Sequence, residues 1–350
     1  MIDNLGIGTY IRNLIYWLPK ISNNEYILFG ESNKLRDFNL PVIESNFPIY
    51  SWQEQVFFAR IIKKAKLDVF HSPHYNLPIM YPKKIIVTIH DLIHLIFPEY
   101  LPSKLAWLYA KFLMKMACKR SQKIIAVSEN TKNDILRYFK IDSTKIEIIY
   151  EGVEEIFKPS LKKTEMMRKK YGKYILYVGA IRPHKNILCL IEAFYILKKI
   201  YKIEHKLILI GKQKIPYIYQ VKKKISNCLL ENEIVFIENV TQDELVDFYC
   251  GAELFVFISL YEGFGLPVVE AMACGCPVIA SNISSLPEIV GDAGILVNPY
   301  NIDEICRCIY KVLTDRYLQE DMCKKGLQQA KKFSWYLTAK KTLELYEQLM

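Results

Sequence analysis

The sequence predicts an α/β protein of two domains, each built on a parallel sheet. Short apolar runs rich in β-branched residues alternate with amphipathic stretches along most of the 350 residues. This alternation is typical of parallel strands joined by helical crossovers. The length favours two domains, and a content of 51% hydrophobic residues supplies a large core. Because no uncharged apolar run reaches roughly 18 residues, we expect no transmembrane helix.

The first predicted domain covers residues 1–155. Its expected strands are 26–29, 68–71, 84–89, 123–127 and 146–149. Its expected helices lie near 8–18, 52–65, 103–120 and 130–139. Each strand is a short apolar run, and each helix repeats apolar residues at helical spacing.

The second predicted domain covers residues 173–333, and its alternation of strands and helices resumes at Tyr174. Its expected strands are 174–179, 207–211, 234–237, 254–258, 278–281 and 294–297. The polar segment 156–172 is predicted as a linker, and residues 334–350 as a terminal helix. Ligands of doubly wound sheets bind beyond the carboxyl ends of the strands.

Charge and cysteine content restrict the classes of function that the sequence can have. A net charge of +10 suits nucleic acid, an anionic membrane surface or a phosphorylated substrate, although biased base composition of the gene also explains an excess of lysine. The sequence carries no nucleic-acid-binding motif, so we expect no nucleic-acid partner. Nine cysteines, an odd number without a C-x2-C pair, indicate reduced core cysteines in a cytoplasmic protein.

Two glutamates frame a glycine-rich turn in the run Glu262-Gly-Phe-Gly-Leu-Pro-Val-Val-Glu270. A proline suits the first turn of a helix, so we expect a helix here with Glu270 on its first turn and Gly275 at its end. The amides of Gly263, Phe264, Gly265 and Leu266 would then point from a positive helix end toward a phosphate or sugar hydroxyls. The structural alternative makes Glu270 a complement to the helix dipole and Glu262 a solvated loop residue.

A basic turn follows the strand that begins the second domain. In the run Tyr177-Val-Gly-Ala-Ile-Arg-Pro-His-Lys-Asn186, we expect Arg182 and Lys185 to meet at the end of the strand. Two fixed cations there suit a diphosphate whose charge grows as it departs. A solvated basic turn is an equally good interpretation of the residues alone. Gly6 and Gly8 form a weaker phosphate-loop candidate, for which a plain helix start is the alternative.

Histidines and a serine complete the candidate residues. His90 closes the strand 84–89, and the pairs His71/His74 and His90/His94 have spacings that metal ligands use. Because Pro73 interrupts the first pair and no acidic cluster joins either, we expect no metal there. Ser128 is explained by a helix N-cap and remains a secondary candidate for the site.

The quoted runs resemble the retaining glycosyltransferases of family 4. Similarity extends through Leu254-Phe-Val-Phe-Ile-Ser-Leu-Tyr, Pro277-Val-Ile-Ala-Ser and Leu286-Pro-Glu-Ile, and the nine-residue run from Glu262 to Glu270 matches the E-x7-E signature of that family. The resemblance implies the GT-B fold, in which two Rossmann-like doubly wound domains face each other across a cleft and the terminal helix crosses back to the first domain.

The resemblance also implies roles. Glu270 would bind the donor ribose, Glu262 and the 263–266 amides the sugar, Lys185 and Arg182 the departing diphosphate, and His90 with the Gly8 loop the sugar from the first domain. Many members have arginine directly after the glycine, where this chain has Ala180, so Lys185 is the firmer assignment and Arg182 a shifted equivalent. No cofactor or metal is required, and no D-x-D pair occurs in the sequence.

The resemblance further implies transfer of a hexose or deoxyhexose from a nucleotide sugar to a glycan or lipid-linked acceptor. Mannosyl- or rhamnosyl-type chemistry with a donor like GDP-mannose is favoured, in surface-polysaccharide assembly. The alternatives are a catalytically inactive sugar-nucleotide-binding subunit, an inverting GT-B transferase, or a sugar-nucleotide epimerase. A nicotinamide-dependent oxidoreductase is discounted because no G-x-G-x-x-G follows a strand.

Two further expectations concern the basic helices and the start of the chain. The stretches 52–66 and 103–120 carry recurrent lysines, which suit the anionic inner face of a membrane. A core-facing stripe with a solvated basic face is the more common explanation.

Gly6 follows Met1 too closely for a preceding central strand, which needs about 5–6 residues, so we expect the first domain to lack its first strand as the sequence is given.

Overall fold

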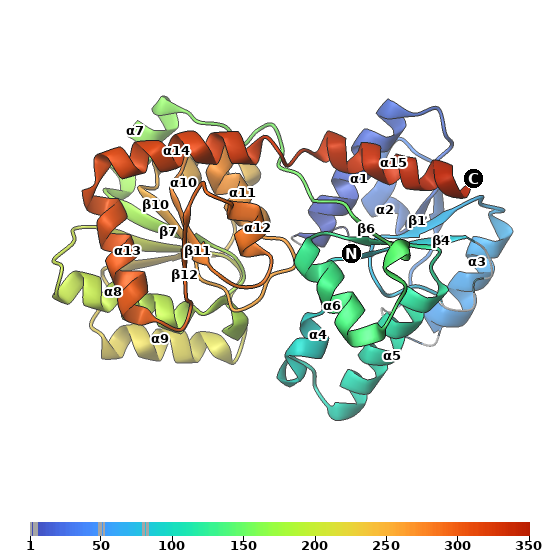
Figure 1. Ribbon diagram of the computed structural model, residues 1–350, viewed down its shortest axis with the longest axis horizontal. Coiled ribbons are helices and arrows are strands. Elements are labelled where there is room, and N and C mark those ends of the chain that lie inside the picture. The colour runs from blue at the N-terminus through green and yellow to red at the C-terminus, as the bar shows by residue number, and fades with distance from the viewer. Residues whose placement is uncertain (1, 3–5, 48–50, 52, 79–80, 82–83) are drawn as a thin grey trace. The chain divides into compact units, whose positions relative to one another are not determined.

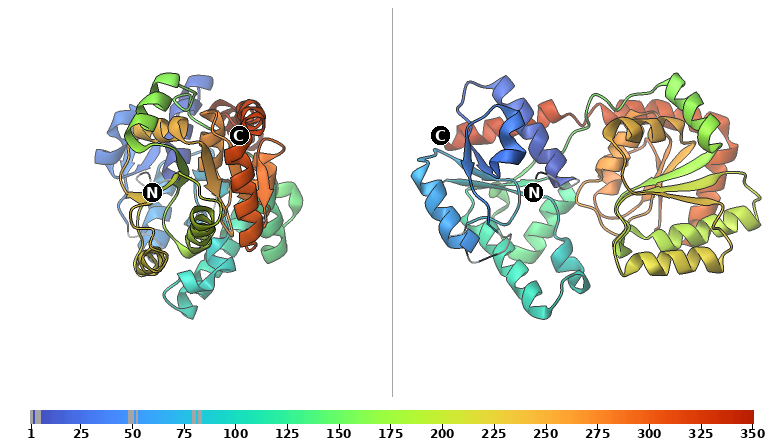
Figure 2. Two further views of the ribbon diagram at one scale, coloured as in Figure 1. Left: turned by 90° about the vertical axis from the view of Figure 1, so that its left-hand side faces the viewer. Right: turned by 180° about the vertical axis from the view of Figure 1, so that it is seen from behind.

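The chain divides into two compact units, drawn in Figure 1 and Figure 2. The structure is a computed structural model that describes residues 2, 6–47, 51, 53–78, 81 and 84–350. Unit 1 comprises Met1–Gly152 and Trp335–Met350, and unit 2 comprises Val153–Ser334.

Unit 1 is built on a four-stranded parallel sheet in the order β3-β4-β5-β6. These strands are β3 (Phe70–Ser72), β4 (Ile85–Ile89), β5 (Lys123–Ala126) and β6 (Ile146–Ile148). A second, two-stranded parallel sheet pairs β1 (Leu28–Gly30) with β2 (Val42–Glu44). Within the described residues the two sheets are separate, and no strand precedes the first helix.

Side-chain alternation along β4 gives the unit 1 sheet two buried faces. Ile85, Val87 and Ile89 share a core with apolar residues of α5 (Lys104–Arg120) and α6 (Glu129–Phe139). Ile86, on the opposite face, packs with Leu345 of α15 (Trp335–Leu349). Successive residues of a strand point to opposite faces, so one strand supplies both cores. Figure 1 shows α15 beside α1 (Ile7–Ile21), which it contacts.

The remaining elements of unit 1 are short. They are α2 (Ser32–Leu35), η1 (Arg36–Phe38), η2 (Glu54–Phe58), α3 (Ala59–Lys64), α4 (Ile93–Ile96), η3 (Pro98–Tyr100) and η4 (Ser143–Lys145). The helix predicted over 52–65 is therefore a π-helical turn followed by α3, and Trp52 lies outside the described residues.

Unit 2 contains a six-stranded parallel sheet in the order β12-β11-β10-β7-β8-β9. Its strands are β7 (Tyr174–Val178), β8 (Lys206–Ile210), β9 (Ile234–Ile237), β10 (Leu254–Phe257), β11 (Val278–Ser281) and β12 (Ile295–Val297). The chain winds outward from β7 to β9 and then returns past β7 to β10, so the order reverses between β7 and β10. Such a reversal is a topological switch point, where the loops at the carboxyl ends diverge and admit a ligand.

Helices cover both faces of the unit 2 sheet. The helical elements of unit 2 are α7 (Leu161–Tyr171), η5 (Pro183–Lys185), α8 (Ile187–Lys199), α9 (Tyr217–Asn227), α10 (Gln242–Gly251), α11 (Leu266–Ala273), α12 (Leu286–Val290), α13 (Ile302–Thr314) and α14 (Arg316–Ala330). Figure 1 shows α8 and α9 on one side of the sheet and α10 and α11 on the other. Within the described residues, no helix is both long and apolar enough to cross a membrane.

The structure differs from the sequence-based expectation at two segments. The segment 156–172, predicted as a linker, contains α7, which packs against α10 within unit 2. Only Met167 of α7 is buried, so its apolar periodicity is weak. Strand β2 was not predicted, because it is three residues long and its side chains are partly exposed. The expectation of a missing first strand stays a prediction, since residues 1 and 3–5 lie outside the described residues.

Candidate active site

A lysine and a glutamate meet at the switch point of unit 2. Lys185 ends the 3₁₀ turn η5 after β7, and Glu262 lies in the loop after β10. Lys185 Nζ lies 2.5 Å from Glu262 Oε1, and their side chains are only 15% and 11% exposed. The backbone N–H of Leu260 donates to the His184 carbonyl at 2.7 Å, which joins the two loops. Residues 77 positions apart in sequence therefore form a largely desolvated ion pair.

Two serines hold the loop that carries Glu262. The Ser284 hydroxyl accepts from the Glu262 backbone N–H at 2.9 Å and donates to the carbonyl of the same residue. The Ser285 hydroxyl donates to the Phe264 carbonyl at 2.8 Å. Gly265 follows with a φ of 113°, and a Cβ on it would lie 2.9 Å from Leu286. The loop is thereby fixed at the amino end of α11, where backbone N–H groups lack intrahelical partners.

Glu270 lies on the second turn of α11, whereas the sequence predicted the first. The helix begins at Leu266, so Glu270 falls on its second turn, and the first turn contains no acidic residue. The expected end of the helix is confirmed: Cys274 is the C-cap, and Gly275 has a φ of 73°. The Tyr249 hydroxyl of α10 donates to Glu270 Oε2 at 2.8 Å.

Burial sets the protonation of the Glu270–Tyr249 pair. Burial raises the pKa of Glu270 to about 7; the bond from Tyr249 opposes this shift, and the charge of Glu154 adds to it. Burial and the nearby Glu270 charge raise the pKa of Tyr249 well above its usual value. Tyr249 therefore stays a hydrogen-bond donor, and Glu270 changes charge near neutral pH.

Arg182 is placed differently from Lys185. It precedes η5 as its N-cap, and its side chain is exposed. Among the described residues its guanidinium forms no ion pair, so it stays available to an incoming anion. Both cations act on His184, whose pKa is lowered to about 3 by burial and by the charges of Lys185 and Arg182.

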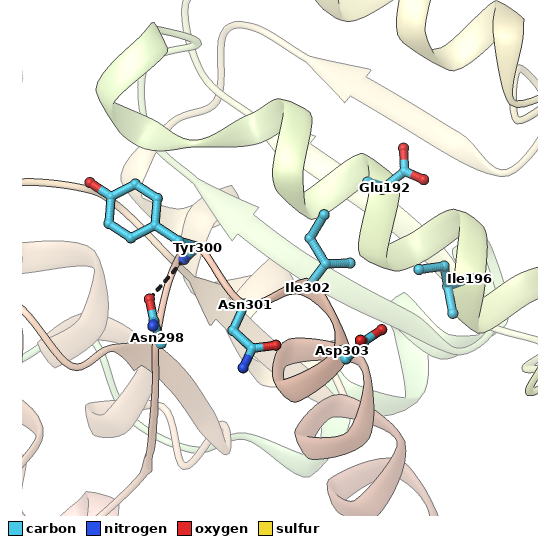
Figure 3. Close-up of a pocket in the computed structure, with 7 residues that line it drawn as sticks. All are labelled: Glu192, Ile196, Asn298, Tyr300, Asn301, Ile302 and Asp303. Atoms are coloured by element: carbon cyan, nitrogen blue, oxygen red, sulfur yellow. Dashed lines mark hydrogen bonds between the residues drawn. The ribbon is translucent and has the colours of Figure 1, made fainter.

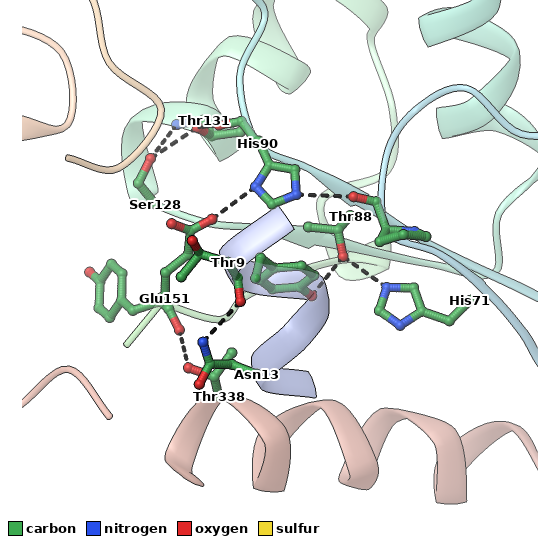
Figure 4. Close-up of polar contacts among 12 residues, drawn as sticks. Thr9, Asn13, His71, Thr88, His90, Ser128, Thr131, Glu151 and Thr338 are labelled. Atoms are coloured by element: carbon green, nitrogen blue, oxygen red, sulfur yellow. Dashed lines mark hydrogen bonds and ion pairs between the residues drawn. The ribbon is translucent and has the colours of Figure 1, made fainter. Parts of the chain in front are cut away.

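His90, the candidate of unit 1, follows β4 and is 8% exposed. Figure 4 shows a dashed line at each nitrogen of its ring. Nδ1 lies 2.8 Å from Oε1 of Glu151, and Nε2 lies 3.0 Å from the Pro73 carbonyl. The Tyr10 ring of α1 packs edge-on against it at 4.9 Å between centroids. Thr131, whose backbone N–H bonds the Ser128 N-cap as expected, donates from its hydroxyl to the His90 carbonyl at 3.3 Å.

Gly8 lies inside α1, as its second residue, rather than in a loop before the helix. A Cβ at this position would lie 2.2 Å from the carbonyl oxygen of Ile2. Crowding against the backbone therefore explains this glycine without a ligand. Gly6, with a φ of 75°, is the N-cap.

The other histidines of unit 1 bond to separate partners. His71 contacts the Tyr346 hydroxyl at 2.6 Å and the Thr88 hydroxyl at 2.8 Å. His94 Nδ1 contacts the Tyr75 hydroxyl at 2.8 Å, and His74 Nδ1 accepts from the backbone N–H of Asn76 at 3.3 Å. In the part of the chain that the structure describes, no group of three His, Cys, Asp or Glu side chains converges as metal ligands would.

A hollow of about 450 Å³ on unit 2 contains none of the residues predicted from the sequence. Figure 3 shows its lining, contributed by α8 and by the chain from β12 into α13. The lining residues are Glu192, Ile196, Asn298, Tyr300, Asn301, Ile302 and Asp303. Two carboxylates in the lining oppose the binding of a diphosphate, so the switch point remains the candidate site.

Comparison with known proteins identifies the family. The profile of glycosyl transferases group 1 matches residues 161–329, and that of glycosyltransferase family 4 matches residues 6–155. O-antigen chain mannosyltransferase B of Escherichia coli is 32% identical over 295 residues, which cover 82% of this chain and 76% of that protein. The chain belongs to the family 4 glycosyltransferases. The resemblance inferred from the E-x7-E run is therefore confirmed.

Other relatives of this glycosyltransferase support the same assignment. Serotype-specific mannosyltransferase WbdA of Escherichia coli is 31% identical over 80% of this chain, which spans only 36% of the length of WbdA. HepE of Anabaena, solved with UDP and glucose, superposes with a TM-score of 0.80 at 18% identity, covering 98% of this chain and 96% of HepE. At that identity the likeness concerns the fold, and the GT-B architecture of two Rossmann-like units is confirmed.

Sequence reasoning missed three residues that contact the candidate residues of the two units. Tyr249 bonds Glu270, Glu151 bonds His90, and Ser284 bonds the backbone of Glu262. Glu151 and Ser284 follow the ends of β6 and β11, so the rule that ligands bind beyond carboxyl ends offered a signal for both. Tyr249 is in a helix and gave no such signal, because its contact depends on how α10 packs beside α11.

The raised pKa of Glu270 predicts a pH-dependent stability that Glu270→Gln removes. Between the ordinary glutamate pKa and about 7, the folded protein holds a proton that the unfolded chain releases. This contribution to stability is complete at acidic pH and is lost as the pH rises through about 7. Over this pH range, the wild type should lose at most about 3 kcal/mol of unfolding free energy relative to Glu270→Gln. Solvent that reaches the half-buried carboxyl screens its charge and makes the loss smaller.

Urea titrations across this pH range measure the difference, and Glu231→Gln, at an exposed position of unit 2, controls for loss of one negative charge. A difference between wild type and Glu270→Gln that is constant with pH would show that this carboxyl titrates like an ordinary surface glutamate.

Proposed function

We propose that this glycosyltransferase moves a hexose or deoxyhexose from a nucleotide sugar to a hydroxyl group, with retention at the anomeric carbon. The observation that carries the proposal is the Lys185–Glu262 contact of 2.5 Å at the switch point of unit 2. A cation and a carboxylate fixed on separate loops suit a donor that presents both a diphosphate and sugar hydroxyls.

In the proposed reaction the acceptor attacks from the leaving-group side. The bond from the anomeric carbon to the diphosphate oxygen breaks, and its electron pair stays on the diphosphate. The bond to the acceptor oxygen forms on the same face, and the acceptor proton passes to a phosphate oxygen. Lys185 and the exposed Arg182 balance the growing negative charge, so the chain needs neither a nucleophile nor a metal ion.

Binding roles follow from the geometry of α11 and its preceding loop. Glu262 and the amide groups of Gly263, Phe264, Gly265 and Leu266 would hold the sugar. Glu270 would accept hydrogen bonds from the ribose hydroxyls, which its charged form does best. We further propose that His90 contacts the transferred sugar. Gly8 is kept as a weaker candidate, because backbone crowding already accounts for it.

The named activities of the relatives narrow the donor. Mannosyltransferase B and WbdA are mannosyltransferases by name, and the former acts on the O-antigen chain. These similarities support a donor like GDP-mannose and a glycan or lipid-linked acceptor for this chain. The presence of Lys185, Glu262 and Glu270 together argues against a catalytically inactive subunit.

Replacing Lys185 should lower the activity while leaving the protein folded. Lys185→Ala removes a charge-assisted contact to the diphosphate, which should lower kcat/KM roughly ten- to a hundredfold. Glu270→Ala should reduce turnover through loss of ribose contacts. The assay follows sugar transfer by NMR from a panel that includes GDP-mannose and UDP-glucose, with the anomeric configuration of the product as a second readout.

The matched control is Lys222→Ala, an exposed lysine of α9 in the same unit. It should retain full activity and the wild-type unfolding temperature, whereas Lys185→Ala and Glu270→Ala should keep the fold, shown by cooperative unfolding, at an unfolding temperature that the loss of a buried charge can shift. Wild-type turnover in Lys185→Ala, or an inverted product, would contradict the proposal.

Helix α5 favours a second property, contact with an anionic membrane surface. One face of α5 buries Leu113, Met114 and Ala117. Apolar side chains nevertheless remain on its outer surface: Leu105 is 77% exposed, Leu108 53% and Phe112 50%. The same helix carries Lys104, Lys111, Lys115 and Lys119. Apolar and basic side chains together suit the headgroup region of an anionic bilayer, as expected of an enzyme on the inner face of a membrane with a lipid-linked acceptor.

Vesicle co-sedimentation tests this surface. The wild type should sediment with phosphatidylglycerol vesicles, less at high salt, and little with phosphatidylcholine alone. Leu105→Ser combined with Phe112→Ser should abolish the binding. Leu161→Ser, an 83% exposed leucine of α7, is the matched control and should bind normally. Equal sedimentation of wild type and the double variant would exclude α5 as the membrane contact.

A further inference from the structure

The surroundings of the His90 ring present hydrogen-bond acceptors at both nitrogens. The Glu151 side chain, 4% exposed, approaches Nδ1 to 2.8 Å, and the Pro73 carbonyl approaches Nε2 to 3.0 Å. A carbonyl oxygen can only accept, so the contact at Nε2 requires a hydrogen on that nitrogen. The contact at Nδ1 requires a second hydrogen, between the ring and the carboxylate. A neutral ring with an ionised glutamate carries one hydrogen too few for both bonds.

From this donor count we propose that Glu151 is a positioning residue, which holds the His90 ring in one orientation as a doubly protonated imidazolium. A buried cation is stable only beside a compensating charge, and Glu151 supplies that charge at hydrogen-bond distance. The pair as a whole is neutral, so it can be buried at moderate cost.

Neighbouring histidines show what happens without such a partner. Burial, with a smaller contribution from repulsion by His90, lowers the pKa of His71 and of His74 to about 3. Neither ring has a carboxylate partner among the described residues, and His71 instead contacts the hydroxyls of Tyr346 and Thr88. In the proposed arrangement, His90 is the one charged ring among these three histidines, because it is the one that has Glu151 as a partner.

Helix α15 and the end of β6 fix the position of Glu151. Ile149 extends the pairing of β6 with β5 through its N–H, which donates to the Ala126 carbonyl at 3.0 Å. The Thr338 hydroxyl of α15 donates to the Tyr150 carbonyl at 2.7 Å, directly before Glu151 (Figure 4). Trp335, at the start of α15, packs edge-on against Tyr10, which in turn packs against His90. The backbone directly before Glu151 is thus held by β5 and α15, and the ring that Glu151 contacts is held by Tyr10.

A doubly protonated ring has consequences for the reaction, and these rest on the proposed function. Such a ring offers N–H donors and no lone pair, so His90 acts as a hydrogen-bond donor to the substrate and cannot serve as a general base. This agrees with a mechanism in which a phosphate oxygen takes the acceptor proton. To donate to a sugar hydroxyl through Nε2, the ring exchanges its bond to the Pro73 carbonyl for one to the substrate.

Nitrogen NMR of the histidine rings tests the proposal without any substrate. In uniformly ¹⁵N-labelled protein near neutral pH, the His90 signals, assigned by their loss in His90→Gln, should show both ring nitrogens protonated. In Glu151→Gln the ring should show one protonated nitrogen. Glu151→Asp keeps a carboxylate and should keep the doubly protonated ring. The matched control Glu147→Gln, on β6 at a side chain that is 45% exposed, should leave the spectrum unchanged.

Kinetics supply the second readout. Glu151→Gln should lower kcat about ten- to a hundredfold, the effect of losing a hydrogen bond between charged groups, with little change in KM for the donor. Glu151→Asp should recover part of this loss. A wild-type ring with one protonated nitrogen, or an unchanged ring in Glu151→Gln, would overturn the proposal whatever the activity. Absence of glycosyl transfer in every variant and in the wild type would instead overturn the proposed function and leave the ring result standing.

Discussion

The ion pair between Lys185 and Glu262 is the interaction on which the candidate site depends. Parallel strands bring the loops after β7 and β10 to one edge of the unit 2 sheet, and the order of strands reverses between them. Without that topology the two residues, 77 positions apart, would not meet. Two largely buried charges are costly alone, and their contact of 2.5 Å offsets the cost for both. Glu262 thus holds the Lys185 cation at the switch point, and in the proposed function the diphosphate of the donor takes the place of Glu262.

Unit 1 also pairs a glutamate with a basic side chain beyond the ends of its strands. Glu151, beyond the end of β6, pairs with His90, beyond the end of β4, and both are buried. In unit 2 the basic group ends a long lysine side chain, whereas in unit 1 it is a ring that contacts Glu151, the Pro73 carbonyl and Tyr10. If His90 is doubly protonated, as proposed, each unit presents one positive group beside one glutamate. A reaction that expels a diphosphate without a protein base needs positive groups of this kind rather than an acid/base pair.

Much of the fold and of the unit 2 site could be predicted from the sequence, because short apolar strands and the run from Glu262 to Glu270 are recognised from local pattern. Every strand of unit 2 was predicted to within one residue or so, since each is an uninterrupted apolar run. Features that depend on packing escaped prediction. Helix α7 buries only Met167, β2 has three partly exposed residues, and the contacts of Tyr249 with Glu270 and of Glu151 with His90 join distant segments. Glu270 was predicted on the first turn rather than the second because Pro267 marks the start of the helix only to within a residue, and the helix begins at Leu266.

The competition between Glu262 and a diphosphate for Lys185 is the central claim, and calorimetric binding of free GDP and UDP tests it most directly. A free nucleoside diphosphate has no transferred sugar to contact Glu262, so only the charge competition remains. Glu262→Gln should release Lys185 and tighten binding of the preferred nucleoside diphosphate by roughly tenfold, as expected for a hydrogen bond between charged groups. Glu262→Gln combined with Lys185→Ala should lose this gain. Unchanged or weaker binding in Glu262→Gln would contradict the account, because Lys185 would then not be the cation that receives the diphosphate.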